Sequence, residues 1–381
     1  MIYLDNAATT RIDDKVLEAM MPYLKENYGN PSTPYEIGIK SAIAIENARK
    51  QFSKAFNCND NEIFFTGGGS EGDNWVLKSF AFDYYFKHKE RVHIITSKIE
   101  HSAILATCQY LTDIDIADVT YINVESNGVV DFEEIENVIT NQPTLISIMT
   151  VNNETGVIQP IKEIGDICSK YDNVYFHTDA TQAVGHIKID VSKWNIDYLT
   201  CSAHKFYGPK GVGVVYIKDD SILSPLIHGG HQERSYRAGT ENVAGIVGAG
   251  YAIEKAMSEI DEEDKNLRNI VAYFINGLYL SDIDFNINGD LTYRVAGTIN
   301  ISFGCLTGQR MQLLLDSYGI CVSTGSACNS GMTNPSHVLT AMGIPDEEAL
   351  RAVRFSFGKY TTYKDVDYVL ESIKDIYNNF R

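Results

Sequence analysis

Apolar and polar stretches alternate along the first two thirds of the chain in a pattern that predicts a layered α/β fold. Short apolar runs typical of buried strands are separated by longer segments with helical periodicity, such as 35–56 and 161–171. The strand-like runs are 62–66, 92–96, 119–123, 145–150, 174–178 and 212–217. This alternation predicts a mostly parallel sheet covered by helices, with ligand-binding loops at the C-terminal ends of its strands.

The pattern changes from about residue 261, where a charged helical stretch leads into a second group of elements. Apolar runs at 297–303, 320–323 and 352–357 predict strands, and 363–380 predicts a last helix. We interpret this region as a smaller α/β domain that the N-terminal segment joins. The expected division is a large domain at 15–258 and a small domain formed by 1–14 and 259–381.

Composition favours a cytoplasmic enzyme with reduced thiols. The 381 residues are 44% hydrophobic, which is enough for a large core, and no apolar run reaches the length needed to span a membrane. The 7 cysteines include no Cys-x-x-Cys pair, which argues against a disulfide scaffold or a structural zinc site, so we expect no metal. With 32 basic and 50 acidic residues, the net charge of −18 argues against direct nucleic-acid binding.

Lys205 and Asp179 are the first candidates for chemistry. Lys205 lies in Ser-Ala-His-Lys just before a strand-like run, and Asp179 lies at the end of the run 174–178. Lysine forms Schiff bases with pyridoxal phosphate (PLP), and an aspartate beside the pyridine nitrogen keeps that ring electron-withdrawing. Asp179 could also cap a helix. The two residues together favour PLP binding.

A glycine-rich stretch, Gly67-Gly68-Gly69-Ser70, supplies a candidate anion site. It follows the strand-like run 62–66 and precedes an apolar helical pattern. Backbone N–H groups and a helix N-terminus at such a loop can bind phosphate. The stretch is neither a Walker loop, since no Gly-Lys-Ser/Thr follows, nor a dinucleotide fingerprint.

With these features in place, the chain resembles the NifS/IscS-type cysteine desulfurases, which are class V PLP enzymes of aminotransferase fold type I. The resemblance covers nearly the whole chain. Its motifs are Tyr3 to Thr10, Gly29 to Ser32, Glu100-His101, Val151 to Gly156, Asp179 to Gln182, Ser202 to Lys205, Arg237 to Asn242 and Gly325 to Cys328. The resemblance implies a large domain with a mostly parallel seven-stranded sheet flanked by helices, a smaller C-terminal α/β domain, a homodimer and PLP as cofactor.

The resemblance also implies a role for each matching residue. Lys205 holds PLP and moves the Cα proton, while His101 stacks on the ring and exchanges protons with the substrate. Asn153 contacts substrate and cofactor, and Arg354 clamps the substrate carboxylate. The remaining cofactor contacts are Asp179 and Gln182 at the ring, and Gly69, Ser70, Ser202, His204 and the other subunit's Thr240 at the phosphate.

Cys328 is the residue that narrows the expected activity. It lies in the small-residue run Ser323 to Gly331, which predicts a loop rather than packed structure. In the resembling family its thiol takes sulfur from L-cysteine, giving L-alanine and a Cys328 persulfide. Cys108, Cys168, Cys201, Cys305 and Cys321 are instead expected to be small apolar residues of the interior.

The acceptor of the sulfur is left open: an iron–sulfur scaffold protein and a tRNA-thiolation enzyme are both compatible. Selenocysteine lyase and class V aminotransferase activities are alternatives, and a degenerate PLP fold that only binds partners would be expected to have lost Lys205 or Cys328. Ser70 stands where the family commonly has Thr, and Ala203 where it often has Gly. The sequence ends at Arg381, without the tail that docks the scaffold in long-tailed relatives, so that partner is the less secure expectation.

Overall fold

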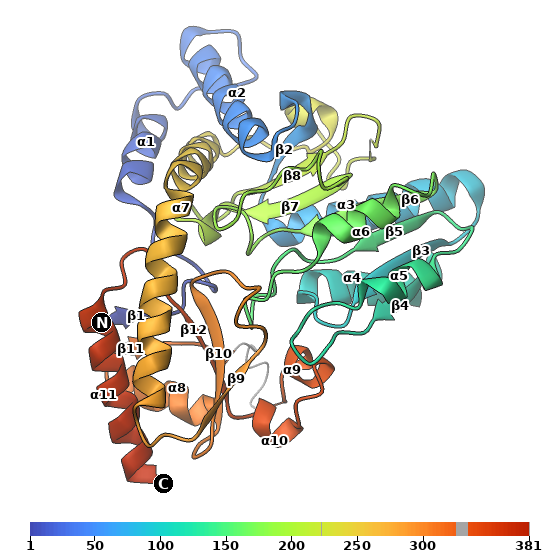
Figure 1. Ribbon diagram of the computed structural model, residues 1–381. Helices are drawn as coiled ribbons and strands as arrows, with labels where there is room; N and C mark the ends of the chain where they lie inside the picture. The colour runs from blue at the N-terminus through green and yellow to red at the C-terminus, as the bar shows by residue number, and fades with distance from the viewer. Residues whose placement is uncertain (222, 325–333, 381) are drawn as a thin grey trace.

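The computed structural model describes residues 1–221, 223–324 and 334–380, and its largest unit is a seven-stranded sheet (Figure 1). The strand order is β2-β8-β7-β6-β5-β3-β4. The strands are β2 Ile63–Thr66, β3 Val92–Ser97, β4 Ala117–Ile122, β5 Thr144–Ser147, β6 Val174–Asp179, β7 Tyr198–Ser202 and β8 Gly213–Ile217. β8 is antiparallel to both neighbours and the other pairs are parallel. The predicted mostly parallel seven-stranded sheet is therefore confirmed.

Helices cover both faces of this sheet, which explains why its strands, except the edge strand β4, are buried at nearly every position. Ile94 faces a cluster with α3 (Gly69–His88) and α4 (Ser102–Asp113). The next residue, Ile95, faces a cluster with α2 (Glu36–Phe56), α6 (Ile161–Cys168) and α7 (Val243–Tyr279). Successive side chains of a strand point to opposite faces, so a sheet covered on both sides can bury consecutive residues of its strands.

The strand-like runs of the sequence did not include the segment Tyr198–Ser202, which is a strand in the structure. This segment forms β7, which is buried along its whole length. Thr200 is 0% exposed, and its hydroxyl lies 3.1 Å from His177 Nε2. A polar side chain can occupy an interior strand when its hydrogen bonds are satisfied there.

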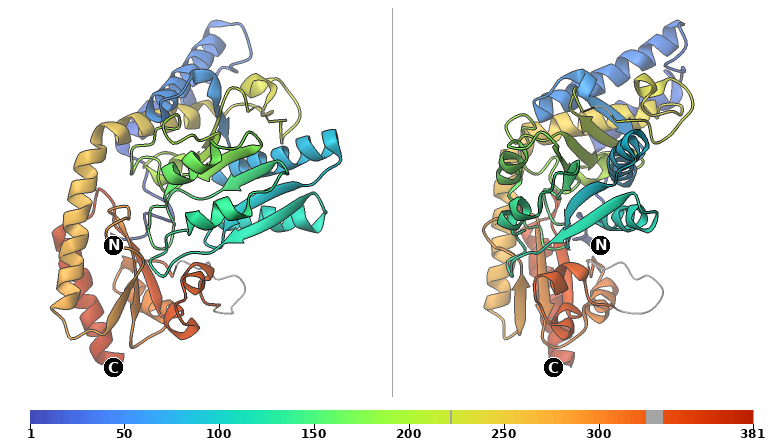
Figure 2. Two further views of the ribbon diagram at one scale, coloured as in Figure 1. Left: turned by 45° about the vertical axis from the view of Figure 1, so that its right-hand side comes forward. Right: turned by 90° about the vertical axis from the view of Figure 1, so that its right-hand side faces the viewer.

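A second, smaller unit lies at the other end of α7 (Figures 1 and 2). It contains the antiparallel sheet β12-β10-β9 and the parallel pair β1-β11, which joins Ile2 to Ile320. Its elements are β1 Ile2–Tyr3, β9 Phe285–Asn288, β10 Thr298–Phe303, α8 Gly308–Ser317, β11 Ile320–Cys321, α9 His337–Ala341, α10 Asp346–Ala349, β12 Ala352–Ser356 and α11 Tyr363–Phe380. The N-terminus thus packs with the C-terminal region.

The proposed domain boundary at 258/259 falls within α7, which is one continuous helix of 37 residues. Two observations support the division as a proposal: the small unit has its own apolar cluster around Phe274, Ile301 and Phe355, and α7 contributes to both clusters. The remaining helices are α1 Asp14–Lys25, α5 Phe132–Val138, η1 Asp60–Glu62, η2 Ala203–Lys205 and η3 Gln232–Ser235. Within the described ranges, no helix combines the length and apolarity required to cross a membrane.

Candidate active site

The C-terminal ends of β2, β3, β5, β6 and β7 meet at one edge of the large sheet, because these strands share one direction. The loops that follow them surround a cavity of about 400 Å³. The lining includes these residues that the sequence singled out: Gly69, Ser70, His101, Asn153, Asp179, Gln182, Ser202, His204, Lys205 and Arg354. Segments far apart in the sequence therefore meet in one place.

Lys205 enters the cavity from the short helix η2, directly after β7. Its Nζ donates hydrogen bonds to the carbonyl oxygens of Ala7 (2.6 Å) and Ala8 (2.8 Å). Burial, followed by the positive charge of Arg354, lowers the pKa of Lys205 to about 8. An amine with this pKa is partly neutral near neutral pH, and the neutral form is the nucleophile.

Asp179 ends β6 and is 5% exposed. Its Oδ1 accepts a hydrogen bond from the backbone N–H of Thr181 at 2.9 Å. Gln182, one turn further on, donates from Nε2 to the carbonyl of Ala7 at 2.8 Å. The N-terminal segment thus contacts both the lysine and the glutamine of the cavity.

One side of the cavity offers neutral hydrogen-bond donors beside a helix N-terminus. Helix α3 starts at Gly69, and Ser70 and Ser202 line the cavity near it. His204 Nδ1 lies 3.1 Å from Thr9 Oγ1, and burial, followed by the charge of Lys205, lowers the pKa of His204 to about 4. The imidazole is therefore neutral, and with the helix dipole this side suits a bound anion.

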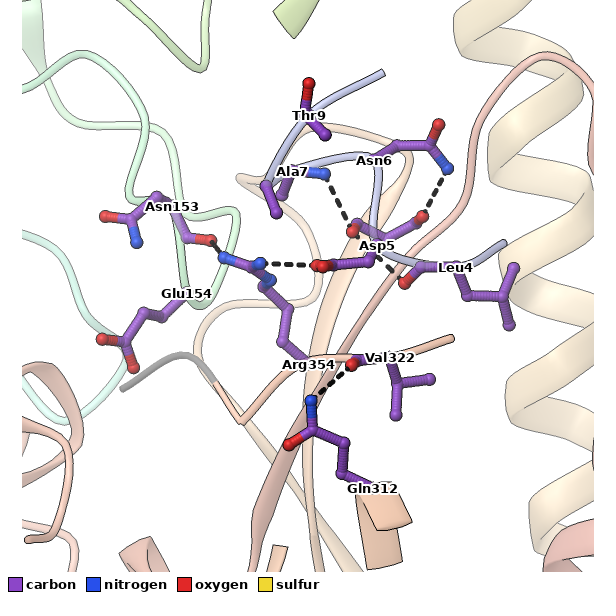
Figure 3. Close-up of polar contacts among 12 residues, drawn as sticks. Leu4, Asp5, Asn6, Ala7, Thr9, Asn153, Glu154, Gln312, Val322 and Arg354 are labelled. Carbon is purple, nitrogen blue, oxygen red and sulfur yellow. Dashed lines mark hydrogen bonds and ion pairs between the residues drawn. The ribbon is translucent and has the colours of Figure 1, made fainter. Parts of the chain in front are cut away.

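Arg354 reaches the cavity from β12 of the small unit (Figure 3). It is 4% exposed, donates from Nη1 to the carbonyl of Asn153 at 2.8 Å, and pairs through Nη2 with Asp5 Oδ1 at 2.7 Å. Among the described residues its Nε has no hydrogen-bond partner. A buried guanidinium with unused N–H groups can bind a carboxylate.

One of the described residues predicted from the sequence is not part of this arrangement. Thr240 is exposed and does not line the cavity. Cys328 lies in 325–333, outside the described residues. Sequence reasoning in turn missed Asp73 and Thr181, which line the cavity, and the roles of the Ala7 and Ala8 carbonyls. Asp73 follows the glycine-rich stretch by three residues, but nothing in this spacing indicated where its side chain points.

Unsatisfied polar atoms are concentrated in this cavity. Within the described ranges, six buried side-chain nitrogen or oxygen atoms lack a hydrogen-bond partner, and three of them belong to the cavity residues Asp73, Thr181 and Arg354. Buried polar groups are normally paired, so unpaired ones at one place indicate a ligand site. A carboxylate, a low-pKa lysine and an anion-binding helix end fit a phosphorylated pyridine ring.

Comparison with known proteins agrees with this geometry. The Aminotransferase class-V model matches residues 2–369. "Cysteine desulfurase IscS" of Methanosarcina thermophila is 50% identical over 380 residues, which is 100% of this chain and 93% of the relative. The protein of the same name from Clostridium botulinum (strain Hall) is 49% identical, covering 98% and 94%. A solved structure described as a NifS-like protein superposes with a TM-score of 0.92 at 40% identity, over 99% of both chains.

The chain therefore belongs to the class V aminotransferase family. Within that family it groups with the cysteine desulfurases, as the sequence motifs predicted.

Proposed function

We propose that the protein is a PLP-dependent cysteine desulfurase that works in the cavity at the C-terminal edge of the large sheet. In the net reaction, L-cysteine loses its sulfur to the thiol of Cys328. The carbon–sulfur bond of the substrate breaks and a sulfur–sulfur bond forms. The products are L-alanine and a persulfide on Cys328.

The residues of the cavity divide into a cofactor set and a substrate set. Lys205 is the residue that would hold PLP, Asp179 would lie at its pyridine nitrogen, and Gln182 at its ring oxygen. The phosphate would be held by Gly69, Ser70, Ser202 and His204, with Thr240 of a second subunit. When bound, PLP supplies an electron-withdrawing ring that acidifies the substrate Cα.

Around that cofactor, the chain's own side chains would bind the amino acid and move its protons. Arg354 would bind the carboxylate, and Asn153, whose carbonyl already holds the guanidinium, would fix its orientation. Lys205 would move the Cα proton, since its lowered pKa lets it act as a base near neutral pH. His101, beside the cavity mouth, would exchange a proton with the substrate.

The observation that carries this proposal is the presence in one cavity of the buried Asp179 and Arg354 with the partly buried Lys205, each from a different element. The experiment is an assay of L-alanine and sulfide formed from L-cysteine, with added PLP and a reductant. Equal amounts of the two products are expected. Neither product, or products unchanged when PLP is stripped, would rule the proposal out.

Two alternatives share the Lys205 and Asp179 pair. A selenocysteine lyase would release alanine from selenocysteine but little from cysteine. A class V aminotransferase would instead turn over with a 2-oxo acid as amino acceptor and would not need Cys328. Assaying all three substrates with one preparation separates them.

A shared active site in a homodimer is the further part of the proposal, because Thr240 is exposed and away from its own cavity. In a heterodimer of Lys205→Ala and Thr240→Ala chains, the site that keeps Lys205 would receive an intact Thr240 from its partner and should regain wild-type PLP affinity. A monomeric active enzyme would refute this. The sulfur acceptor, either an iron–sulfur scaffold or a tRNA-thiolation enzyme, and a cytoplasmic location are expectations for pull-down and fractionation to test.

A further inference from the structure

Asp73 is a buried carboxyl group of the cavity that the reaction described above does not use. It lies on the second turn of α3 and is 1% exposed. Its Oδ1 has no hydrogen-bond partner among the described residues and lies 3.8 Å from His177 Nε2. One polar atom each of Asp73, His101 and Asp179 lie within 4.8 Å of one another. Asp73 therefore adjoins the carboxylate assigned to the pyridine nitrogen.

Gly72 lets the start of α3 pack closely against the sheet, and this packing buries the Asp73 side chain. A Cβ on Gly72 would lie 2.6 Å from Thr200 Cγ2 and 2.8 Å from Val215 Cγ2. Only glycine lets the start of the helix approach β7 and β8 so closely. The next side chain, Asp73, is then directed into the interior beside β6.

Two ionised carboxylates at this spacing in a buried site would repel each other strongly. Asp179 has a backbone N–H, that of Thr181, to stabilise its charge at 2.9 Å. Burial, followed by the charge of Asp179, raises the pKa of Asp73 well above its ordinary value. The proton of the pair therefore belongs on Asp73.

The neighbouring titratable groups His177 and Glu100 supply no positive charge that would let Asp73 and Asp179 both be ionised. His177 is buried between Ser147 Oγ (2.9 Å) and Thr200 Oγ1 (3.1 Å), and burial lowers its pKa to about 3, so it is neutral. Glu100 adds a third buried carboxyl, whose pKa burial raises to about 8.

The two positively charged side chains of the cavity make their ion pair and hydrogen bonds with groups other than Asp73 and Asp179. Arg354 is paired with Asp5, and Lys205 is bonded to two backbone carbonyls. His101, the remaining titratable neighbour, is exposed.

We propose that Asp73 is a positioning residue that keeps a proton and donates a hydrogen bond to Asp179, so that the pair presents a single negative charge to the ring nitrogen. This inference rests on the proposed function, in which Asp179 holds that nitrogen. The inference adds that the Asp73 carboxyl is a neutral hydrogen-bond donor to Asp179. An amide of the same shape can replace such a group, whereas a methyl group cannot.

The test compares Asp73→Asn and Asp73→Ala with wild type in the PLP-loaded protein. The infrared difference between wild type and Asp73→Asn at neutral pH should contain the carbonyl band of a protonated carboxylic acid. PLP affinity, measured by reloading stripped protein, should stay within about threefold in Asp73→Asn and fall about tenfold or more in Asp73→Ala, the loss of one hydrogen bond to a charged group. Asp197→Asn is the matched control: Asp197 is a buried carboxyl that does not line this cavity, so PLP affinity should not change.

The inference is overturned if the difference spectrum shows carboxylate bands in place of the acid band, since Asp73 would then be ionised. It is also overturned if Asp73→Asn weakens PLP binding as much as Asp73→Ala does, or if neither changes it. The infrared comparison decides the matter even when Asp73→Ala does not fold. If the wild-type protein binds no PLP, this result would instead contradict the proposed function itself.

Discussion

The large sheet has a cavity at each end, and each cavity is lined by one lysine and by aspartates, but the electrostatic environments of the two lysines differ. The candidate site, about 400 Å³, lies at the C-terminal ends of the parallel strands. A larger cavity, about 810 Å³, lies at the opposite end, where β6 begins at Val174 and β8 is followed by Lys218. It is lined by a lysine, three aspartates and two cysteines, residue types that also occur in enzyme sites.

The two lysines show why we propose the smaller cavity as the reactive one. Lys218 Nζ lies 3.2 Å from Asp197 Oδ1, and although burial acts to lower its pKa, the charge of Asp197 raises it. Among the described residues, the hydrogen-bond acceptors of Lys205 are backbone carbonyls alone, and burial lowers the pKa of Lys205 to about 8. A lysine that is paired with a carboxylate stays a cation, whereas an unpaired buried one becomes a nucleophile. Cavity size alone would have selected the wrong end of the sheet.

Replacing each lysine by alanine should give the largest contrast. Lys205→Ala should lower L-alanine release from cysteine by at least about 10³-fold, because both the cofactor attachment and the Cα base are lost. Lys218→Ala should retain nearly full kcat and lose only stability. An equal loss of L-alanine release in the two variants would contradict the proposal that only the smaller cavity is the active site.

The cysteines extend the contrast to the sulfur-transfer step. Cys328→Ser should bind PLP and cysteine normally yet release alanine at least about 100-fold more slowly, because the sulfur has no nucleophile to receive it. Cys168→Ser should turn over normally, since burial raises the pKa of Cys168 and keeps it a thiol. Mass spectrometry after one turnover should locate the persulfide on Cys328. A persulfide on Cys58 or Cys168 would move the chemistry to the larger cavity.

Arg354→Lys should have a smaller effect. It keeps the charge but loses the planar fork, so kcat/KM for cysteine should fall by about 1–3 kcal/mol of transition-state stabilisation, the worth of one charge-assisted hydrogen bond. Arg351→Lys is the control, because Arg351 lies three residues earlier and pairs with the exposed Glu347. An unchanged kcat/KM in Arg354→Lys would show that the carboxylate binds elsewhere.

The smallest expected effect is the pH dependence of PLP attachment, which tests whether the attaching lysine has the lowered pKa of Lys205. The lowered pKa of Lys205, about 8, means that its reactive neutral form grows as pH rises through that value. Stripped protein should therefore take up PLP about tenfold faster at pH 9 than at pH 7, with a plateau above. A rate that keeps rising toward pH 10 and beyond would indicate an ordinary exposed lysine.

The sequence predicted the fold and most of the cavity because the relevant residues follow strand-like runs. Asp179 ends one such run and Lys205 follows another, and parallel strands bring their C-terminal ends to one edge. Strand β7 escaped detection because the polar residues Thr200 and Ser202 interrupt its apolar pattern, although both form hydrogen bonds inside the core. Asp73 escaped because helix phase and the close approach at Gly72, rather than any motif, direct its side chain inward.

The most direct test of the account is to identify which lysine carries the cofactor. Protein loaded with PLP is reduced with borohydride, digested, and mapped by mass spectrometry. The account predicts one pyridoxyl group per chain, on the peptide that contains Lys205. A label on Lys218, or one spread over exposed lysines, would contradict the assignment of the smaller cavity as the active site.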